Sequence, residues 1–167
     1  MAGEILGAYV KAVMSSMLSS TATLLFPQHR KRIDEMQNDV WYPLDEYVQM
    51  VNDLHAKLGD ATMTALGQAS ITKTFQLTKA AGLDTLDKVF KDFSVTSKDV
   101  VRNGPPGDVV HTVSFTKDTV VLESETRLPP SLLIGYFRGL MFGFGKVVTN
   151  ESVERKGSHV RFTLKYL

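Results

Sequence analysis

The sequence predicts an α+β fold in which a helical N-terminal bundle packs on a four-stranded antiparallel sheet. Apolar residues recur with helical spacing over residues 1–102, whereas four short segments with strand-like alternation follow in residues 103–167. Between the second and third of these segments lies an apolar stretch in which Gly135, Gly139 and Gly143 recur at every fourth position. These observations indicate a glycine-striped helix between two hairpins.

The N-terminal part is expected to hold four or five helices. Apolar pairs four residues apart indicate an amphipathic first helix, and Pro43 favours the first turn of a later one. Gly59 and Gly82 favour helix ends, because glycine readily adopts the left-handed conformation that often follows a helix. The expected helices are residues 3–20, 29–37, 43–59, 61–81 and 84–93.

The C-terminal part begins at Asn103-Gly104-Pro105-Pro106-Gly107-Asp108, where helix-breaking residues predict a loop. Alternating, β-branched segments then predict one hairpin before the glycine-striped helix and a second one after it. The expected strands are residues 109–115, 119–124, 146–155 and 159–167. The length of 167 residues is typical of one domain, so both parts are expected to form a single domain, 1–167.

The glycine stripe requires a packing reason, because each glycine destabilises a helix interior by about 1 kcal/mol relative to alanine. Four-residue spacing places the glycines on one face, where another backbone can approach closely. Leu128-Pro129-Pro130-Ser131 opens the segment, and Gly145 ends it. We therefore expect a buried helix held against the sheet.

Composition excludes several classes of function. The net charge of +1, with Arg30-Lys31-Arg32 as the single basic triplet, argues against a nucleic-acid-binding face. The chain has no cysteine, which rules out disulfides, cysteine nucleophiles and thiolate metal sites. No apolar run reaches the roughly 20 residues of a membrane span, and the N-terminus lacks signal-peptide features. A cytoplasmic protein is expected.

No catalytic constellation is present in the sequence. The histidines His29, His55, His111 and His159 share no ligand spacing, and neither a nucleophile elbow nor a phosphate-binding glycine loop occurs. The sequence therefore predicts a protein that is not an enzyme.

Aromatic residues are the candidates to line a pocket between the helices and the sheet, because apolar walls with one or two polar anchors are typical of small-molecule sites. The candidates are Trp41, Tyr42, Tyr47, Phe75, Phe90, Phe93 and Phe137. Arg138 interrupts the glycine-striped helix and either pairs with a carboxylate such as Glu123 or faces an anionic ligand. The same aromatic residues would equally fill a solid core, and the sequence leaves both interpretations open.

Several motifs between Val40 and Leu167 carry a resemblance to known proteins. They are Tyr42-Pro43, Ala65-Leu66-Gly67, Leu86, and Pro130 to Phe162 with Gly135, Gly139, Gly145 and Gly157. With these residues, the chain resembles a superfamily of heme nitric-oxide/oxygen-binding domains, vinyl-reductase-type small-molecule-binding domains and vesicle-tethering subunits of Golgi transport. It is most similar to a small uncharacterised family described mainly from myxobacteria. The resemblance implies a sensory module with a pocket for an apolar or amphipathic molecule.

The resemblance also implies where heme or a metal would bind, and the sequence differs there. The proximal-histidine motif of the heme domains corresponds to Leu86-Asp87-Lys88-Val89-Phe90, and phenylalanine cannot bind iron. Their Tyr-x-Ser-x-Arg motif for heme propionates corresponds to Leu122–Arg127, with Leu for Tyr and Arg one position late. The vinyl-reductase metal site uses cysteines, and only Glu151 and His159 remain as ligands. No cofactor and no metal are therefore expected.

Two functions remain as hypotheses. The first is a non-enzymatic ligand-binding or sensory module that acts through a protein partner. The alternative is an adaptor with a filled core, which dimerises and binds no ligand. In either case the apolar stripe of the N-terminal helix is expected to pack in the core or to form a homodimer interface.

Overall fold

The structure is a computed structural model that describes residues 3–167 and confirms the α+β fold; Met1 and Ala2 of the expected 1–167 domain lie outside the described residues. The helices are α1 (Gly7–Ser15), α2 (Ser19–Leu25), α3 (Pro27–Glu35), α4 (Leu44–Ala80), α5 (Leu86–Phe90), α6 (Phe93–Val100), the short 3-10 helix η1 (Pro106–Asp108) and α7 (Pro130–Gly143). The strands are β1 (Glu4–Leu6), β2 (Trp41–Pro43), β3 (Val101–Arg102), β4 (His111–Phe115), β5 (Thr119–Ser124), β6 (Val148–Lys156) and β7 (His159–Tyr166).

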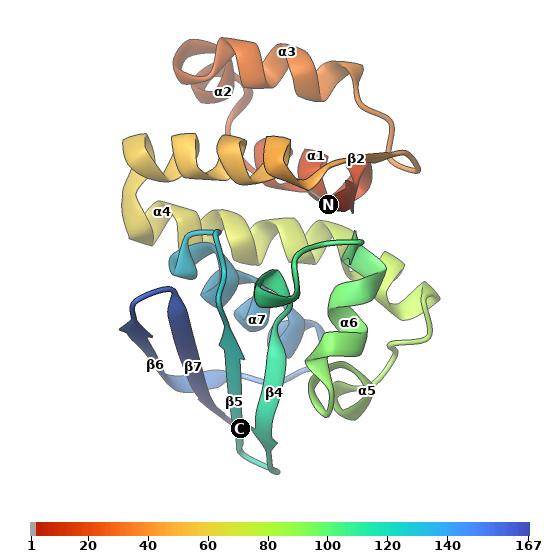
Figure 1. The fold of residues 1–167 in the computed structure, drawn as a ribbon, viewed down its shortest axis with the longest axis vertical. Coiled ribbons are helices and arrows are strands. Elements are labelled where there is room, and N and C mark those ends of the chain that lie inside the picture. Colours follow the sequence, from red (N-terminus) through yellow and green to blue (C-terminus); the bar gives the residue numbers. More distant parts are fainter. Residues whose placement is uncertain (1–2) are drawn as a thin grey trace.

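The two predicted hairpins form one antiparallel sheet of four strands, in the order β4-β5-β7-β6. In its central strands Val120 pairs with Leu164 and Leu122 with Phe162. Because alternate residues of a strand point to the same face, these four side chains form one apolar surface. All four are fully buried in the same cluster as α7, which lies behind the sheet in Figure 1.

The glycine stripe of α7 faces α4 and not the sheet, so the prediction that the stripe packs against the sheet was wrong. A Cβ at Gly139 would lie 2.8 Å from the Cβ of Ile71, and one at Gly135 would lie 2.9 Å from the Cα of Gly67. Both distances are too short for real side chains, so only glycine allows the two helices to approach this closely. The large apolar side chains of α7, such as Phe137, pack on the sheet instead.

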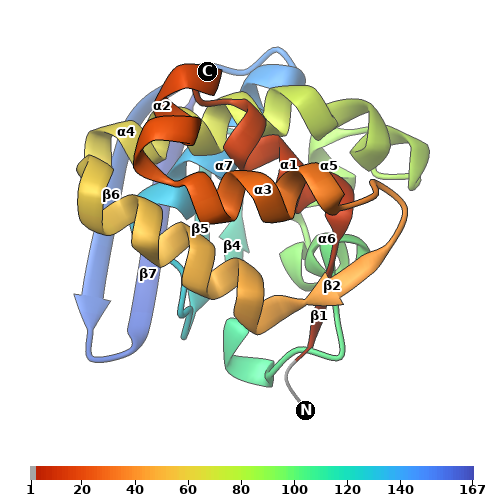
Figure 2. The same ribbon diagram turned by 90° about the horizontal axis from the view of Figure 1, so that it is seen from above.

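Helix α4 is broken at Gly59, as the sequence predicts. Gly59 has φ 77° and ψ 175°, a conformation outside the helical region that glycine adopts without steric cost. Residues 44–58 and 60–80 are therefore two helical segments with a sharp turn between them (Figures 1 and 2). We refer to them as the first and second segments of α4.

The N-terminus differs from the expected helix over residues 3–20. Glu4–Leu6 is the central strand of a second, small sheet with the order β2-β1-β3, which was not predicted. Strands of two or three residues contain too few side chains to show a period of two. Helix α1 begins at Gly7, whose N–H donates to the carbonyl of Val40 (2.8 Å). Its apolar residues, Tyr9 and Val13 among them, are buried in the core, as one of the two interpretations of this stripe expected. The homodimer stays a prediction.

In place of the single helix expected over residues 84–93, the structure has α5, and a second helix, α6, begins at Phe93. Helix α5 ends at Phe90, and Asp92 then caps α6 by accepting a hydrogen bond from the Ser94 N–H (3.1 Å). Helix α6 was not predicted from the sequence. Its serine, threonine and valine residues have low helix propensity, so packing and the cap determine this helix more than propensity does.

The core consists of two apolar clusters. One joins α1, α3 and the first segment of α4, and the other joins the sheet, α5 and α7. Tyr136 and Leu128 pack against both clusters. Within residues 3–167, no helix has the length and hydropathy needed to cross a membrane.

Candidate functional site

A cavity of about 500 Å³ lies between the two apolar clusters. It is bounded by β1, α1, both segments of α4, α6, α7 and the loop that contains η1. Most of its wall is apolar and comes from residues such as Ile5, Val48, Leu133 and Leu140. Pockets of roughly 300–1,000 Å³ with apolar walls are typical of small-molecule sites. The volume and the apolar wall therefore fall within the range of small-molecule sites.

A row of hydroxyl groups on the second segment of α4 interrupts the apolar wall. Ser70, Thr74 and Thr78 are buried, line the cavity and follow one another at four-residue spacing. Ser70 donates to the Gly67 carbonyl (2.9 Å) and Thr74 to the Ser70 carbonyl (3.1 Å). Because both protons are used on the helix backbone, these hydroxyls offer mainly acceptor lone pairs to the cavity.

Two tyrosines, the buried Tyr47 and the partly buried Tyr136, form a second polar feature of the wall. The hydroxyls of Tyr47 on α4 and Tyr136 on α7 hydrogen-bond to each other. Burial raises the pKa of Tyr136 to about 12, although hydrogen bonds with Tyr47 and Ser70 oppose this rise. Burial and the neighbouring Tyr136 also hold the pKa of Tyr47 well above its ordinary value. Both phenols are therefore neutral near pH 7, and the pair is an uncharged polar anchor.

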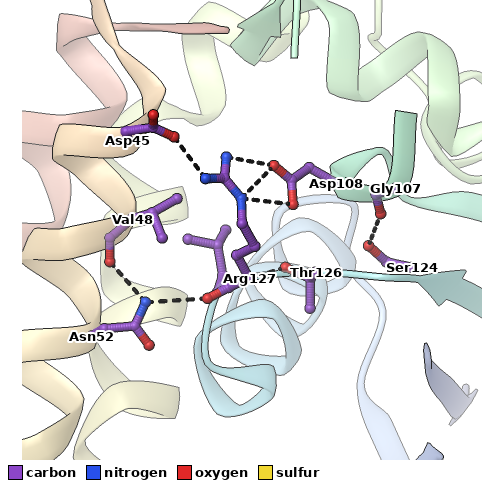
Figure 3. A network of polar contacts seen from close by, with 9 residues as sticks. Asp45, Val48, Asn52, Gly107, Asp108, Ser124, Thr126 and Arg127 are labelled. Atoms are coloured by element: carbon purple, nitrogen blue, oxygen red, sulfur yellow. Dashed lines mark hydrogen bonds and ion pairs between the residues drawn. The ribbon is translucent and has the colours of Figure 1, made fainter. Parts of the chain in front are cut away.

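Arg127 lies in the chain between the cavity-lining residues Thr126 and Leu128 and joins two elements. Figure 3 shows its contacts. Its guanidinium donates to Asp108 (Nη2 to Oδ2, 2.7 Å) and to Asp45 of α4 (Nη1 to Oδ1, 2.6 Å). Its backbone carbonyl accepts a hydrogen bond from Asn52 (3.1 Å). Asp108 itself lines the cavity, and its side chain is only 13% exposed. This network therefore ties the loop with η1 to the first segment of α4.

Two more charged residues line the cavity, Arg102 and Lys98. Arg102 donates to Glu4 (2.8 Å), and its guanidinium lies 4.4 Å above the ring of Trp41. Lys98 on α6 is exposed and, within residues 3–167, has no carboxylate at ion-pair distance. The buried part of the wall thus contains no unpaired charge among the residues described.

The structure separates the aromatic candidates into two groups. Three of them line the cavity: Tyr47, Phe93 and Phe137. Four lie elsewhere: Trp41, Tyr42, Phe75 and Phe90. The first two of these belong to β2 in the small sheet, Phe75 packs edge-on against Phe144, and Phe90 is fully buried in the sheet-side cluster.

Arg138 pairs with a carboxylate, as one of its two interpretations expected, but the partner is Glu151 and not Glu123 (Nε to Oε2, 2.7 Å). Glu123 pairs instead with Arg161 (2.6 Å). Arg138 does not line this cavity but a second, more open hollow of about 600 Å³, together with Gln68, Lys146 and Glu151. A role of Arg138 toward an anionic ligand stays a prediction. Glu151 and His159 also lie apart, since His159 is next to Glu123 (3.6 Å). Over residues 3–167, no three potential ligand side chains gather into a metal site.

Several lining residues were not predicted from the sequence, above all Tyr136, Ser70, Thr74 and Asp108. The sequence contained one indication of this polar part of the wall. Small hydroxyl residues at positions 70, 74 and 78 share a helix face with Leu66 and Ile71, which is unusual for a filled core. Asp108 had no signal, because its place at the rim depends on how the loop folds back on β5.

The fold is that of H-NOX domains. Similar solved structures include an oxygen-binding H-NOX domain related to soluble guanylate cyclases, in its oxygen complex (TM-score 0.62, 14% identity, 96% of this chain and 90% of that chain). Another is the Fe(II) unliganded H-NOX protein from K. algicida (TM-score 0.63, 12% identity, 98% and 97%). A third comes from work on H-NOX activation (TM-score 0.61, 16% identity, 99% and 95%). No protein-family model matches the chain, and no curated protein does. The likeness to the other branches of the superfamily stays a prediction.

The positions expected to hold heme do not fit it. Within residues 3–167 no histidine lines the cavity, and Phe90 is buried away from it. In the segment expected to bind propionates, Leu122 is part of the sheet core and Ser124 donates to the Gly107 carbonyl (3.2 Å). Arg127 is occupied by two carboxylates of the protein itself. Neither an iron ligand nor a partner for propionates is available at these positions.

Proposed function

We propose that this chain is a heme-free, non-enzymatic sensory module that binds an apolar small molecule in its cavity and acts through a protein partner. The cavity carries this proposal: it has about 500 Å³ and a mostly apolar wall with one neutral anchor, the Tyr47–Tyr136 pair. A filled core would have favoured the adaptor hypothesis. The shared fold with a domain described as related to soluble guanylate cyclases supports the sensory role.

The proposal predicts that filling the cavity abolishes binding. Thr74→Phe places a large ring in the cavity, and we expect it to weaken the binding of the neutral fluorescent probe N-phenyl-1-naphthylamine at least about 10-fold. Thr72→Phe is the matched control, because Thr72 is on the same helix and makes the same kind of hydrogen bond, to the Gln68 carbonyl, but is exposed. Titration of probe fluorescence measures both. A wild-type protein that binds no probe, or two variants that bind equally, would contradict ligand binding in this cavity.

A second experiment tests the proposal that the chain binds no heme. Ferric heme added to the purified protein is expected to keep the absorption spectrum of free heme, because the cavity offers no histidine. A Soret band shifted by the protein, and abolished by Thr74→Phe, would show that heme occupies the cavity.

The buried tyrosine pair predicts a pH dependence of stability. Below the ordinary tyrosine pKa of about 10, both folded and unfolded states are protonated and this pair contributes no pH dependence. Between about pH 10 and 12 the unfolded state loses protons that the folded state retains, so stability falls as the pH rises. Tyr136→Phe should reduce this fall. Denaturant unfolding at several alkaline pH values measures the slope, and an equal slope in wild type and variant would contradict the burial of this phenol.

A further inference from the structure

We propose that Asp108 restricts the cavity to uncharged ligands, because it places a carboxylate in the cavity wall and holds the guanidinium of the neighbouring Arg127. This inference rests on the proposed function and adds the chemical class of the ligand: a largely apolar molecule with a neutral oxygen, such as an alcohol or a phenol. It follows from the position of Asp108, from the pairing of Arg127 and from the polar groups inside the cavity.

The backbone holds Asp108 at the rim. The Gly107 carbonyl next to it accepts hydrogen bonds from the Glu125 N–H (2.8 Å) and from the Ser124 hydroxyl (3.2 Å), which fix the loop to the end of β5 (Figure 3). The Asp108 N–H donates to the Pro105 carbonyl (3.0 Å). Asp108 therefore faces the cavity in a fixed position, with its carboxylate largely buried.

Two carboxylates of the protein itself balance the positive charge of Arg127. Asp108 takes two of its N–H groups, Nε at 2.9 Å and Nη2 at 2.7 Å, and Asp45 takes Nη1. These pairs, first with Asp108 and then with Asp45, raise the pKa of Arg127, so the guanidinium stays charged and engaged. A ligand carboxylate that approached Arg127 from the cavity would compete with Asp108 for the guanidinium, and it would meet the negative charge of that side chain.

The interior disfavours a carboxylate as well. Ser70 and Thr74 present acceptor lone pairs, which repel an anion, and the tyrosine pair offers at most one free proton because one is shared between its two oxygens. A ligand hydroxyl both donates and accepts, so it can donate to the serine and threonine oxygens or accept from a tyrosine hydroxyl. A buried carboxylate without a cation would lose its hydration and gain no equivalent partner.

Of the two cations that line the cavity, Arg102 is held by Glu4 (2.8 Å), so Lys98, which has no ion-pair partner within residues 3–167, is the competing cation. Its side chain is exposed, and surface ion pairs add little affinity. If an amphipathic ligand nevertheless used Lys98, its carboxylate would remain in water at the rim, and binding would depend on Lys98 and not on Asp108.

The test compares two ligands that differ in one group, decanol and decanoate, as competitors of N-phenyl-1-naphthylamine on the full chain at about pH 8, where decanoate is ionised. We expect wild-type protein to prefer decanol at least about 10-fold. Asp108→Asn leaves the side chain nearly the same size but releases Arg127 from one carboxylate, so it should bring the preference to within about 3-fold. Glu123→Gln, which neutralises a carboxylate outside the cavity, is the control and should keep the wild-type preference.

Each remaining outcome has a definite meaning. Equal binding of decanol and decanoate by wild type, or an unchanged preference in a folded Asp108→Asn variant, would overturn the role of Asp108. Decanoate binding that Lys98→Met abolishes would assign recognition to Lys98 instead. If Asp108→Asn fails to fold, Arg127→Met provides the second test, because loss of the guanidinium should leave decanoate excluded. Failure of both ligands and of the probe to bind wild type would refute the proposed function itself.

Discussion

Replacement of Phe137 by alanine is expected to lower the free energy of unfolding by about 3–5 kcal/mol, the usual cost of removing a large side chain from a core. Phe137 is fully buried at the centre of the sheet-side cluster. Its ring packs edge-on against Phe93 and Phe162, with centroids 5.3 Å and 5.2 Å apart. It therefore joins α7 to α6 and to the sheet, and no neighbouring element can replace both contacts.

Phe142 on the same helix provides the control, because its side chain is 65% exposed. Phe142→Ala should change stability by less than about 0.5 kcal/mol. Denaturant unfolding followed by circular dichroism measures both variants. A loss below about 1 kcal/mol for Phe137→Ala would mean that α7 does not pack on the sheet as described.

Replacement of Gly135 by alanine is expected to destabilise the protein by about 2–3 kcal/mol, although alanine is the better helix former by about 1 kcal/mol. The added Cβ would meet the carbonyl oxygen of Thr64 and would lie 2.9 Å from the Cα of Gly67. Both are backbone atoms of α4, which can move away only if the two helices separate.

Gly143→Ala is the matched control for the stripe. Its Cβ would meet the ring of Phe75, a side chain that is only half-buried and can rotate away. Thermal or denaturant unfolding should therefore show a much smaller loss for Gly143→Ala than for Gly135→Ala. Equal losses at the two positions would contradict a backbone contact at Gly135.

The sequence predicted most of the fold because its long elements have strong local signals. All four strands of the main sheet were predicted to within two residues of their ends, and the break of α4 at Gly59 was expected from the glycine itself. The small sheet was missed, since strands of two or three residues show no period. The partner of the glycine stripe was also missed. The four-residue spacing of the glycines shows that α7 has a face that another backbone can approach. It does not show which element approaches, and only the structure places Gly67 of α4 against that face.

The candidate site was less predictable than the fold. Aromatic residues were chosen as wall candidates, and Tyr47, Phe93 and Phe137 do line the cavity. Phe90 fills the core instead, because an aromatic residue on a helix has the same sequence signal in either place. The polar part of the wall comes from segments far apart in the chain. Tyr47 and Tyr136 are 89 residues apart, and no local pattern links them.

Native mass spectrometry of the purified chain, with an absorption spectrum of the same sample, tests the central claim most directly. We predict an added mass that is lost on denaturation, no Soret band, and loss of the added mass in Thr74→Phe but not in Thr72→Phe. The added mass would identify the ligand, and retention in Thr72→Phe would locate it in the cavity. A Soret band, or a protein that carries no ligand and binds neither the probe nor decanol, would contradict the account.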